Sequence, residues 1–112
     1  MIDLNKFITC TDNLQFKEVS AGALLGKFND GITPEHASFQ LLLLSESGSI
    51  PEHSHPDKEE FQYVISGKGE VSIAGRRASV QAGSIIFIPP EIKHSIRNTE
   101  KDQMKVMEVY AK

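Results

Sequence analysis

Three histidines and a glutamate in this chain have the types and spacing expected of transition-metal ligands. His53 and His55 are separated by one residue, and His94 lies further along the chain. Because alternate side chains of a strand share a face, His53 and His55 would point the same way and form half of a metal site. Glu60 would add an anionic oxygen, and imidazole with carboxylate suits zinc, iron, manganese or nickel. The competing interpretation of the histidine pair is a polar loop that binds nothing.

The glutamate that would join the histidines is one of two neighbours, Glu59 and Glu60. A turn over residues 56–58, followed by an apolar run over 61–66, predicts a strand that returns past the histidine pair. Consecutive residues of a strand face opposite sides, so only one of the two glutamates would face the histidines. The alternative for both is an acidic turn exposed to solvent.

The rest of the chain predicts the elements that must hold these side chains. Short runs rich in Val, Ile and Phe alternate with turn residues at intervals of about 8–12 residues, which is typical of an all-β sandwich or barrel. The turns are expected at 29–31, 47–48, 67–69, 75, 83 and 89–90. Helical periodicity is weak, and only the first fifteen residues leave room for a short helical turn, with Thr11 or Asp12 as its N-cap.

Length and composition restrict the class of protein. The 112 residues, 39% hydrophobic and 24% charged, predict one domain over residues 1–112. The net charge of −3, without a clustered basic face, argues against nucleic acid as a partner. The longest apolar run, residues 41–44, is far shorter than the roughly 20 residues that span a membrane. With no apolar leader at the start, the expectation is a cytoplasmic protein with no membrane partner.

Segments 48–67 and 83–98 together resemble the two motifs of the cupin superfamily. The first motif combines His-x-His, a glutamate and a final glycine, and the second combines glycine, proline, histidine and asparagine. The matching positions are His53, His55, Glu60, Gly67, Gly83, Pro89, His94 and Asn98. The chain departs from the pattern at Gly48, which is displaced by one residue, and at Glu91, where the second motif has glycine. The resemblance implies an all-β fold, a single small antiparallel barrel of the double-stranded β-helix or jelly-roll type.

The resemblance also implies a site and a function. The metal ligands would be His53, His55, Glu60 and His94, and the cofactor one divalent transition metal: iron, manganese, nickel or zinc. The expected function is a metal-dependent enzyme, of the dioxygenase or the isomerase and lyase type, that acts on a small organic molecule. A non-catalytic protein that binds or senses a small ligand or a metal is the alternative. Since cupins commonly pair subunits, a homodimer is expected, with residues 7–28 covering a neighbour's sheet.

The period of two in a strand predicts which residues line the pocket beside the metal. If Glu60 faces inward, then Gln62 and Ser66 share its face, with Gln62 as the best polar partner of a ligand. The candidates for the pocket lining are Gln62, Val64, Ile96 and Met104. No cluster of lysine or arginine falls at these positions, so a phosphorylated substrate is not expected. The sequence does not decide which face of the run 37–44 points inward.

Two other side chains stay outside this scheme. His36 is either a base at the rim of the pocket or an exposed loop residue after a proline turn. Cys10 is the single cysteine, which excludes an intramolecular disulfide, and without a neighbouring base it is expected to be an ordinary thiol. The catalytic residues stay unassigned, because no general base is recognisable beside the metal ligands. That absence favours the binding alternative.

Overall fold

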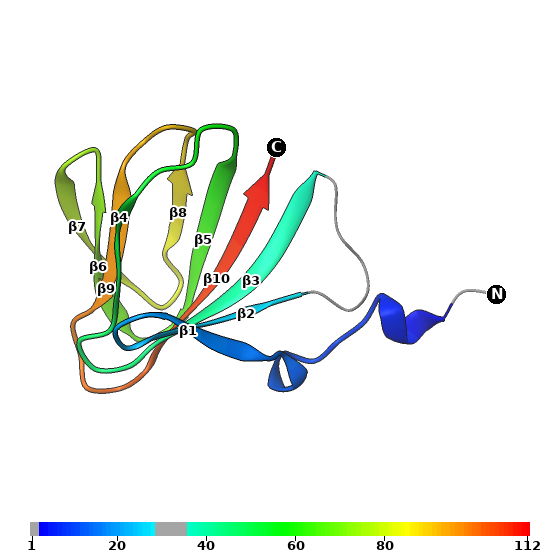
Figure 1. Ribbon diagram of the computed structural model, residues 1–112. Coiled ribbons are helices and arrows are strands. Elements are labelled where there is room, and N and C mark those ends of the chain that lie inside the picture. The colour runs from blue at the N-terminus through cyan, green and yellow to red at the C-terminus, as the bar shows by residue number, and fades with distance from the viewer. Residues whose placement is uncertain (1–2, 29–35) are drawn as a thin grey trace.

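Strands make up most of residues 3–28 and 36–112, which are the residues described by this computed structural model (Figure 1). The strands are β1 (Phe16–Ser20), β2 (Ala23–Lys27), β3 (Ala37–Leu44), β4 (Ser49–His53), β5 (Glu59–Ser66), β6 (Lys68–Ile73), β7 (Arg76–Gln81), β8 (Ile85–Ile88), β9 (His94–Asn98) and β10 (Met104–Ala111). Two single-turn 3-10 helices, η1 (Leu4–Lys6) and η2 (Thr11–Asn13), precede β1. The turn predicted at 29–31 lies outside the described residues.

The strands form two antiparallel sheets that face each other, as Figure 1 shows. The larger sheet has the order β1-β2-β3-β10-β5-β8, and the smaller sheet has the order β4-β9-β6-β7. The chain passes from one sheet to the other between β3 and β4 and back between β4 and β5, and it changes sheet again after β5, β7, β8 and β9. This is the jelly-roll arrangement, and it confirms the all-β barrel predicted from the spacing of turns.

Alternation along the strands sets which side chains enter the barrel. On β3 the inward set is Gln40, Leu42 and Leu44, which decides a choice that the sequence left open. The two leucines join an apolar cluster between the sheets, because removing apolar surface from water is the main favourable term in folding. That cluster consists of Ala23, Leu42, Leu44, Val64, Val71, Val80, Ile86, Ile88, Ile96, Met104 and Val106. Burial of these apolar side chains therefore determines which face of each sheet points into the barrel.

Two of the motif positions stabilise turns rather than the site. Gly67 has a φ of 92°, and a Cβ atom there would lie 2.8 Å from the Cα atom of Met104, so only glycine fits without a shift. The buried side-chain amide of Asn98 donates to the carbonyl oxygens of Leu44, Ser45 and Asp102 at 2.8–3.1 Å. The predicted role of Asn98, a side-chain bond to the backbone, is confirmed.

The N-terminal segment, residues 3–15, extends away from the barrel in Figure 1. It contains the short helical turn that the sequence predicted, but Cys10 rather than Thr11 or Asp12 precedes η2 as its N-cap residue. Leu4, Phe7 and Ile8 of this segment are more than half exposed. Within residues 3–28 and 36–112, no helix has the length and apolar character needed to cross a membrane. The cytoplasmic location and the extent of the domain stay predictions.

Candidate metal centre

His53 and His94 face each other across two neighbouring strands of the smaller sheet. His53 ends β4, His94 begins β9, and the two residues are paired in the ladder. Ile50 pairs with Ile96, so three residues of β4 span the distance that two residues of β9 span. The extra residue is a β-bulge, which re-aims the side chains that follow it. Because of this bulge, His53 points to the inner face that Ile50 already occupies.

His55 lies in the loop after β4, so the prediction that both histidines share one strand was wrong. The loop is held to the second motif by a hydrogen bond of 2.7 Å from the amide of Glu91 to the carbonyl oxygen of His55. Glu91 has a φ of 69°, a left-handed conformation that favours glycine, and glycine is what the motif has at this position. Glu91 therefore adopts the turn conformation expected of the motif glycine and keeps the hydrogen bond to the His55 loop.

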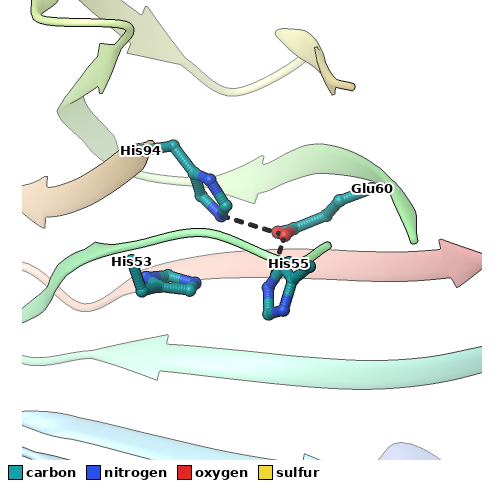
Figure 2. A group of neighbouring side chains, drawn as sticks. All are labelled: His53, His55, Glu60 and His94. Atoms are coloured by element: carbon teal, nitrogen blue, oxygen red, sulfur yellow. Dashed lines mark hydrogen bonds and ion pairs between the residues drawn. The ribbon is translucent and has the colours of Figure 1, made fainter. Parts of the chain in front are cut away.

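Glu60 enters the site from the larger sheet, as the second residue of β5. It is almost fully buried, whereas Glu59 is exposed on the outer face, as the period of two predicted for one of the pair. Ligand atoms of His53, His55, Glu60 and His94 lie within 4.8 Å of one another (Figure 2). Ligands bonded to one metal at about 2.1 Å are at most about 4.2 Å apart, so a contraction of about half an ångström would close the group on an ion.

The histidine tautomers suit metal binding. The Nδ1 atoms of His53 and His94 lie 2.8 and 2.9 Å from the carbonyl oxygens of Pro51 and Ile92. A carbonyl oxygen only accepts, so each Nδ1 carries the proton and each Nε2 presents a lone pair. The Nε2 atom of His94 then lies 3.2 Å from Oε1 of Glu60, and two acceptors at that distance require a cation between them. A proton or a metal ion meets this requirement.

His55 supplies the second observation in favour of a metal. Its Nε2 atom is buried, has no hydrogen-bond partner, and lies 3.5 Å from Oε1 of Glu60 (Figure 2). Buried polar atoms without a partner are rare, and each needs an explanation. Burial lowers the pKa of His55, so its imidazole is neutral at neutral pH and ready to bind a metal. Three imidazoles and a carboxylate are the donor set of a transition metal, and the residues present therefore fit one.

Glu60 and His94 form an ion pair in the protein without metal. Burial acts to raise the pKa of Glu60, but hydrogen bonds from His94 and Gln62 outweigh burial and hold that pKa below its ordinary value. Burial acts to lower the pKa of His94, but hydrogen bonds to Glu60 and to the carbonyl of Ile92 outweigh it and raise that pKa. A metal ion would therefore displace a proton from His94 when it binds.

A buried polar row crosses the larger sheet beside these ligands. Glu108 on β10 is flanked in register by Gln40 on β3 and Gln62 on β5. Gln40 donates to Oε1 of Glu108 at 2.8 Å and to the hydroxyl of Tyr110 at 3.0 Å. Gln62 donates through Nε2 to Oε2 of Glu60 at 2.6 Å and to Oε2 of Glu108 at 3.1 Å. The row thus connects a metal-ligand candidate to a second buried carboxylate.

Burial and neighbouring negative charge raise the pKa values of the acidic groups in this row. Burial, together with the negative charge of Glu60, raises the pKa of Glu108 to about 8 in the metal-free protein. Burial and the charges of Glu108 and Glu60 also raise the pKa of Tyr110. Sequence reasoning missed Glu108 as a functional residue. The signal available was its place in the alternation of residues 104–110, where it is the single acid among apolar side chains.

A cavity of about 200 Å³ opens beside the ligands and the polar row. Its walls include Gln40, His53, Gln62, Ile96, Glu108 and Tyr110. Of the predicted lining residues, Gln62 and Ile96 contact this cavity, whereas Val64 and Met104 are buried in the apolar cluster. Ser66 is exposed, because an irregularity between β5 and β10 near this residue breaks the period of two. His36 and Cys10 are exposed and are not among the grouped ligand atoms.

The jelly-roll barrel and the cluster of three histidines and a glutamate at its mouth define a class of protein. Residues 40–110 match the family model described as Cupin domain, which spans most of the chain. The chain belongs to the cupin domain family, as its two motifs indicated.

Known relatives extend this likeness to named proteins. The chain is 26% identical over 92 residues to the oxalate-binding protein of Thermotoga maritima, which covers 82% of this chain and 74% of that protein. It is 31% identical over 67 residues to polyketide synthase CurC of Streptomyces cyaneus, which covers 60% of this chain and 44% of CurC. The chain spans less than half the length of the first curated relatives that it matches.

Solved structures show the same fold at low sequence identity. A predicted oxalate decarboxylase from Thermotoga maritima superposes with a TM-score of 0.82 at 18% identity, covering 93% of this chain and 97% of that one. KdgF from Halomonas sp. superposes with a TM-score of 0.79 at 17% identity, covering 91% of each chain. At these identities the likeness shows the fold alone.

Proposed function

We propose that this cupin binds one divalent transition metal through His53, His55, Glu60 and His94, and that it is an enzyme of the isomerase or lyase type. The observation that carries the metal is the gathering of ligand atoms from all four residues within 4.8 Å of one another, which leaves Nε2 of His55 buried without a hydrogen-bond partner. When bound, the metal would polarise a carbonyl or hydroxyl oxygen of a small organic molecule.

The placement of Glu108 favours catalysis over simple binding. Burying an acid beside the cavity costs free energy, and transfer of a proton to or from a bound molecule is a function that would retain it there. An isomerase or lyase needs a group that accepts a proton from carbon, within reach of the bound molecule. Glu108 lines the cavity and is oriented by amide donors on both sides, from Gln40 and Gln62. The dioxygenase and the non-catalytic protein remain as outcomes of the test.

The metal is tested by its stoichiometry in untagged protein. Wild type is expected to hold about one equivalent of iron, manganese, nickel or zinc by elemental analysis. His94→Ala and Glu60→Gln should each lose it, because they remove a ligand atom. Glu59→Gln, the matched change one residue away on the exposed face, should keep it. Equal metal contents in the four proteins would refute the ligand assignment.

The same preparations separate the kinds of function. Wild type with metal is expected to exchange carbon-bound hydrogen of small hydroxy and keto compounds for solvent deuterium, observed by NMR. Glu108→Gln should retain the metal and lose the exchange. Oxygen uptake without exchange would indicate a dioxygenase, and neither signal across the panel would indicate a binding protein. Oxalate, for which two of the relatives above are named, has no carbon-bound hydrogen to exchange, so it is tested by binding to the metal-loaded protein instead.

The homodimer expected from the family has a candidate surface. Five apolar side chains of β5 and β8 form an outer apolar face: Phe61, Tyr63, Ile65, Ile85 and Phe87. They are 38–72% exposed, and β8 is an edge strand of the larger sheet. Contiguous apolar patches and unpaired edges mark interaction surfaces. We propose that a second copy covers this face, since the extended N-terminal segment with exposed Leu4, Phe7 and Ile8 offers a complementary apolar element.

A dimer through this face is expected to dissociate when charge is placed in it. Ile85→Lys with Phe87→Lys should convert a dimer into a monomer at micromolar concentration, because buried ammonium groups would be unpaired. Light scattering after size exclusion measures the mass. Ala78→Lys, on an exposed position of β7 in the other sheet, is the control and should leave the mass unchanged. A monomeric wild type would refute the dimer.

A further inference from the structure

The cavity beside the ligand cluster opens into a second, larger groove. This groove has a volume of about 460 Å³ and is lined by residues of the N-terminal segment and of β1 and β2. Val19 and Leu25 line both the groove and the cavity, so the two spaces share an apolar wall. A ligand too long for the cavity would therefore continue into this groove.

Two lysines, Lys17 on β1 and Lys27 on β2, face the groove. The strand register explains why they do. Phe16 is paired with Gly26, and a Cβ atom on Gly26 would lie 2.8 Å from the phenyl ring, so both residues lie on the outer face of the sheet. Successive residues of a strand point to opposite faces. Lys17 and Lys27 therefore point to the inner face, which is the face of the cavity.

Lys27 extends the polar row of the larger sheet. It is paired with Gln40, the residue that donates to Glu108. Neighbouring strands are about 4.8 Å apart, so the three steps from Lys27 on β2 to Gln62 on β5 span about 14 Å. The long side chain of Lys27 covers part of that distance. A molecule that contacts both the metal ligands and Lys27 would be on the order of 10 Å long.

The two lysines bring uncompensated positive charge to the groove. Lys17 is paired with Leu25, and Lys27 follows two residues later on the same strand, so the lysines are diagonal neighbours about 7–8 Å apart. In the part of the chain that the structure describes, neither ammonium group has an ion-pair partner, and no acid lines the groove. An anion bound between the lysines would supply the missing counter-charge.

We infer that the ligand of this cupin carries a negatively charged group at the end remote from the metal, and that Lys17 and Lys27 bind this group. The assignment rests on the proposed function, because the other end of the same molecule is held at the metal. The middle of the molecule is apolar, since Val19 and Leu25 form the wall that the two spaces share. A carboxylate and a phosphate both meet the charge requirement.

Two keto acids of equal length test the role of the lysines. α-Ketopimelate and α-ketoheptanoate present the same keto acid end to the metal, and only α-ketopimelate has a carboxylate at the other end. Calorimetry measures the affinity of both acids for metal-loaded wild type and for the double variant Lys17→Gln with Lys27→Gln. The matched control is Lys68→Gln with Lys101→Gln, which removes two exposed lysines that line neither the groove nor the cavity.

Wild type is expected to bind α-ketopimelate about fivefold more tightly than α-ketoheptanoate, a modest ratio because the lysines are exposed. Lys17→Gln with Lys27→Gln should bind the two acids about equally, whereas the control double variant should keep the wild-type ratio. Salt at about 0.5 M should reduce the wild-type ratio, since it screens exposed charges. A larger ratio for the analogue with a remote phosphonate would support the assignment and identify phosphate as the preferred group.

The outcomes separate the role of the lysines from the proposed function. A wild-type ratio near one, at full metal content, would overturn the assignment and leave the metal site intact. An unchanged ratio in Lys17→Gln with Lys27→Gln, folded by circular dichroism, would also overturn it. Lys17 would then only protect the edge strand β1 from pairing.

If no metal binds, the proposed function fails, and the metal-free protein still tests the groove. NMR titration with α-ketopimelate is then followed at Val19 and Leu25, in the wall between groove and cavity. Shifts that the double variant Lys17→Gln with Lys27→Gln abolishes would support anion binding by the lysines. The absence of such shifts would overturn it.

Discussion

Removing the bound metal with a chelator is expected to lower the Tm of this cupin by about 15 °C. A ligand that binds the folded state alone, at a free concentration a thousandfold above its Kd, stabilises that state by about 4 kcal/mol. For a domain of this size, 1 kcal/mol corresponds to roughly 4 °C in Tm. The metal would replace the proton between His94 and Glu60 and would also satisfy the unpartnered Nε2 atom of His55. Differential scanning calorimetry with and without added metal measures the shift.

The control for this result is a variant with the same fold and an incomplete ligand set. Glu60→Gln keeps the shape of the side chain but removes the anionic oxygen, so its Tm should be the same with and without metal. Glu59→Gln should respond as wild type does, because its side chain is on the exposed face of β5. A wild-type Tm that is independent of metal, at full saturation by elemental analysis, would contradict the prediction.

The fold and the ligand set were accessible to sequence reasoning because both are local properties of the chain. Turn residues and the period of two located the strands, and the family spacing selected Glu60 over Glu59. The structure brings the four selected side chains together from two sheets and one loop. The sequence could not reveal the bulge in β4, because no residue type or spacing between Ile50 and His53 distinguishes a bulged strand from a regular one. The wrong placement of His55 in a strand has a separate source, because β4 ends at His53.

The polar row was out of reach for a different reason. Glu108, Gln62 and Gln40 are separated by 46 and 68 residues along the chain, and they become neighbours through the register of three strands. Each residue alone is one polar position in an otherwise apolar alternation. Along β10 the inner face of the larger sheet changes in three steps. Val106 is paired with the apolar Leu42 and Val64, Glu108 lies in the polar row, and Tyr110 is paired with Glu60. The pairing of residues between neighbouring strands therefore decides where the polar side chains gather.

The metal-free protein is expected to lose stability as the pH rises from about 4.5 to about 8. Burial raises the pKa of Glu108 from 4.5 in the unfolded chain to about 8 in the fold. Above 4.5 the unfolded chain binds fewer protons than the folded protein does, so the free energy of unfolding falls with pH until Glu108 ionises in the fold as well. One pKa unit is about 1.4 kcal/mol, which sets an upper limit of about 5 kcal/mol on the loss. His94, whose pKa is also raised, acts in the same direction above its ordinary value of 6.5, whereas His55, whose pKa is lowered by burial, acts in the opposite direction below 6.5.

Glu108→Gln isolates this contribution because an amide does not titrate. The variant can still accept from one flanking glutamine, and its free energy of unfolding in urea should vary less with pH than that of the wild type between pH 4.5 and 8. Glu70→Gln, which removes a carboxylate that is 27% exposed and paired with Arg97, should leave the wild-type dependence in place. A wild type whose stability rises steadily through this range would mean that Glu108 is ionised in the fold. The buried carboxylate would then be held by its amide donors as a permanent charge.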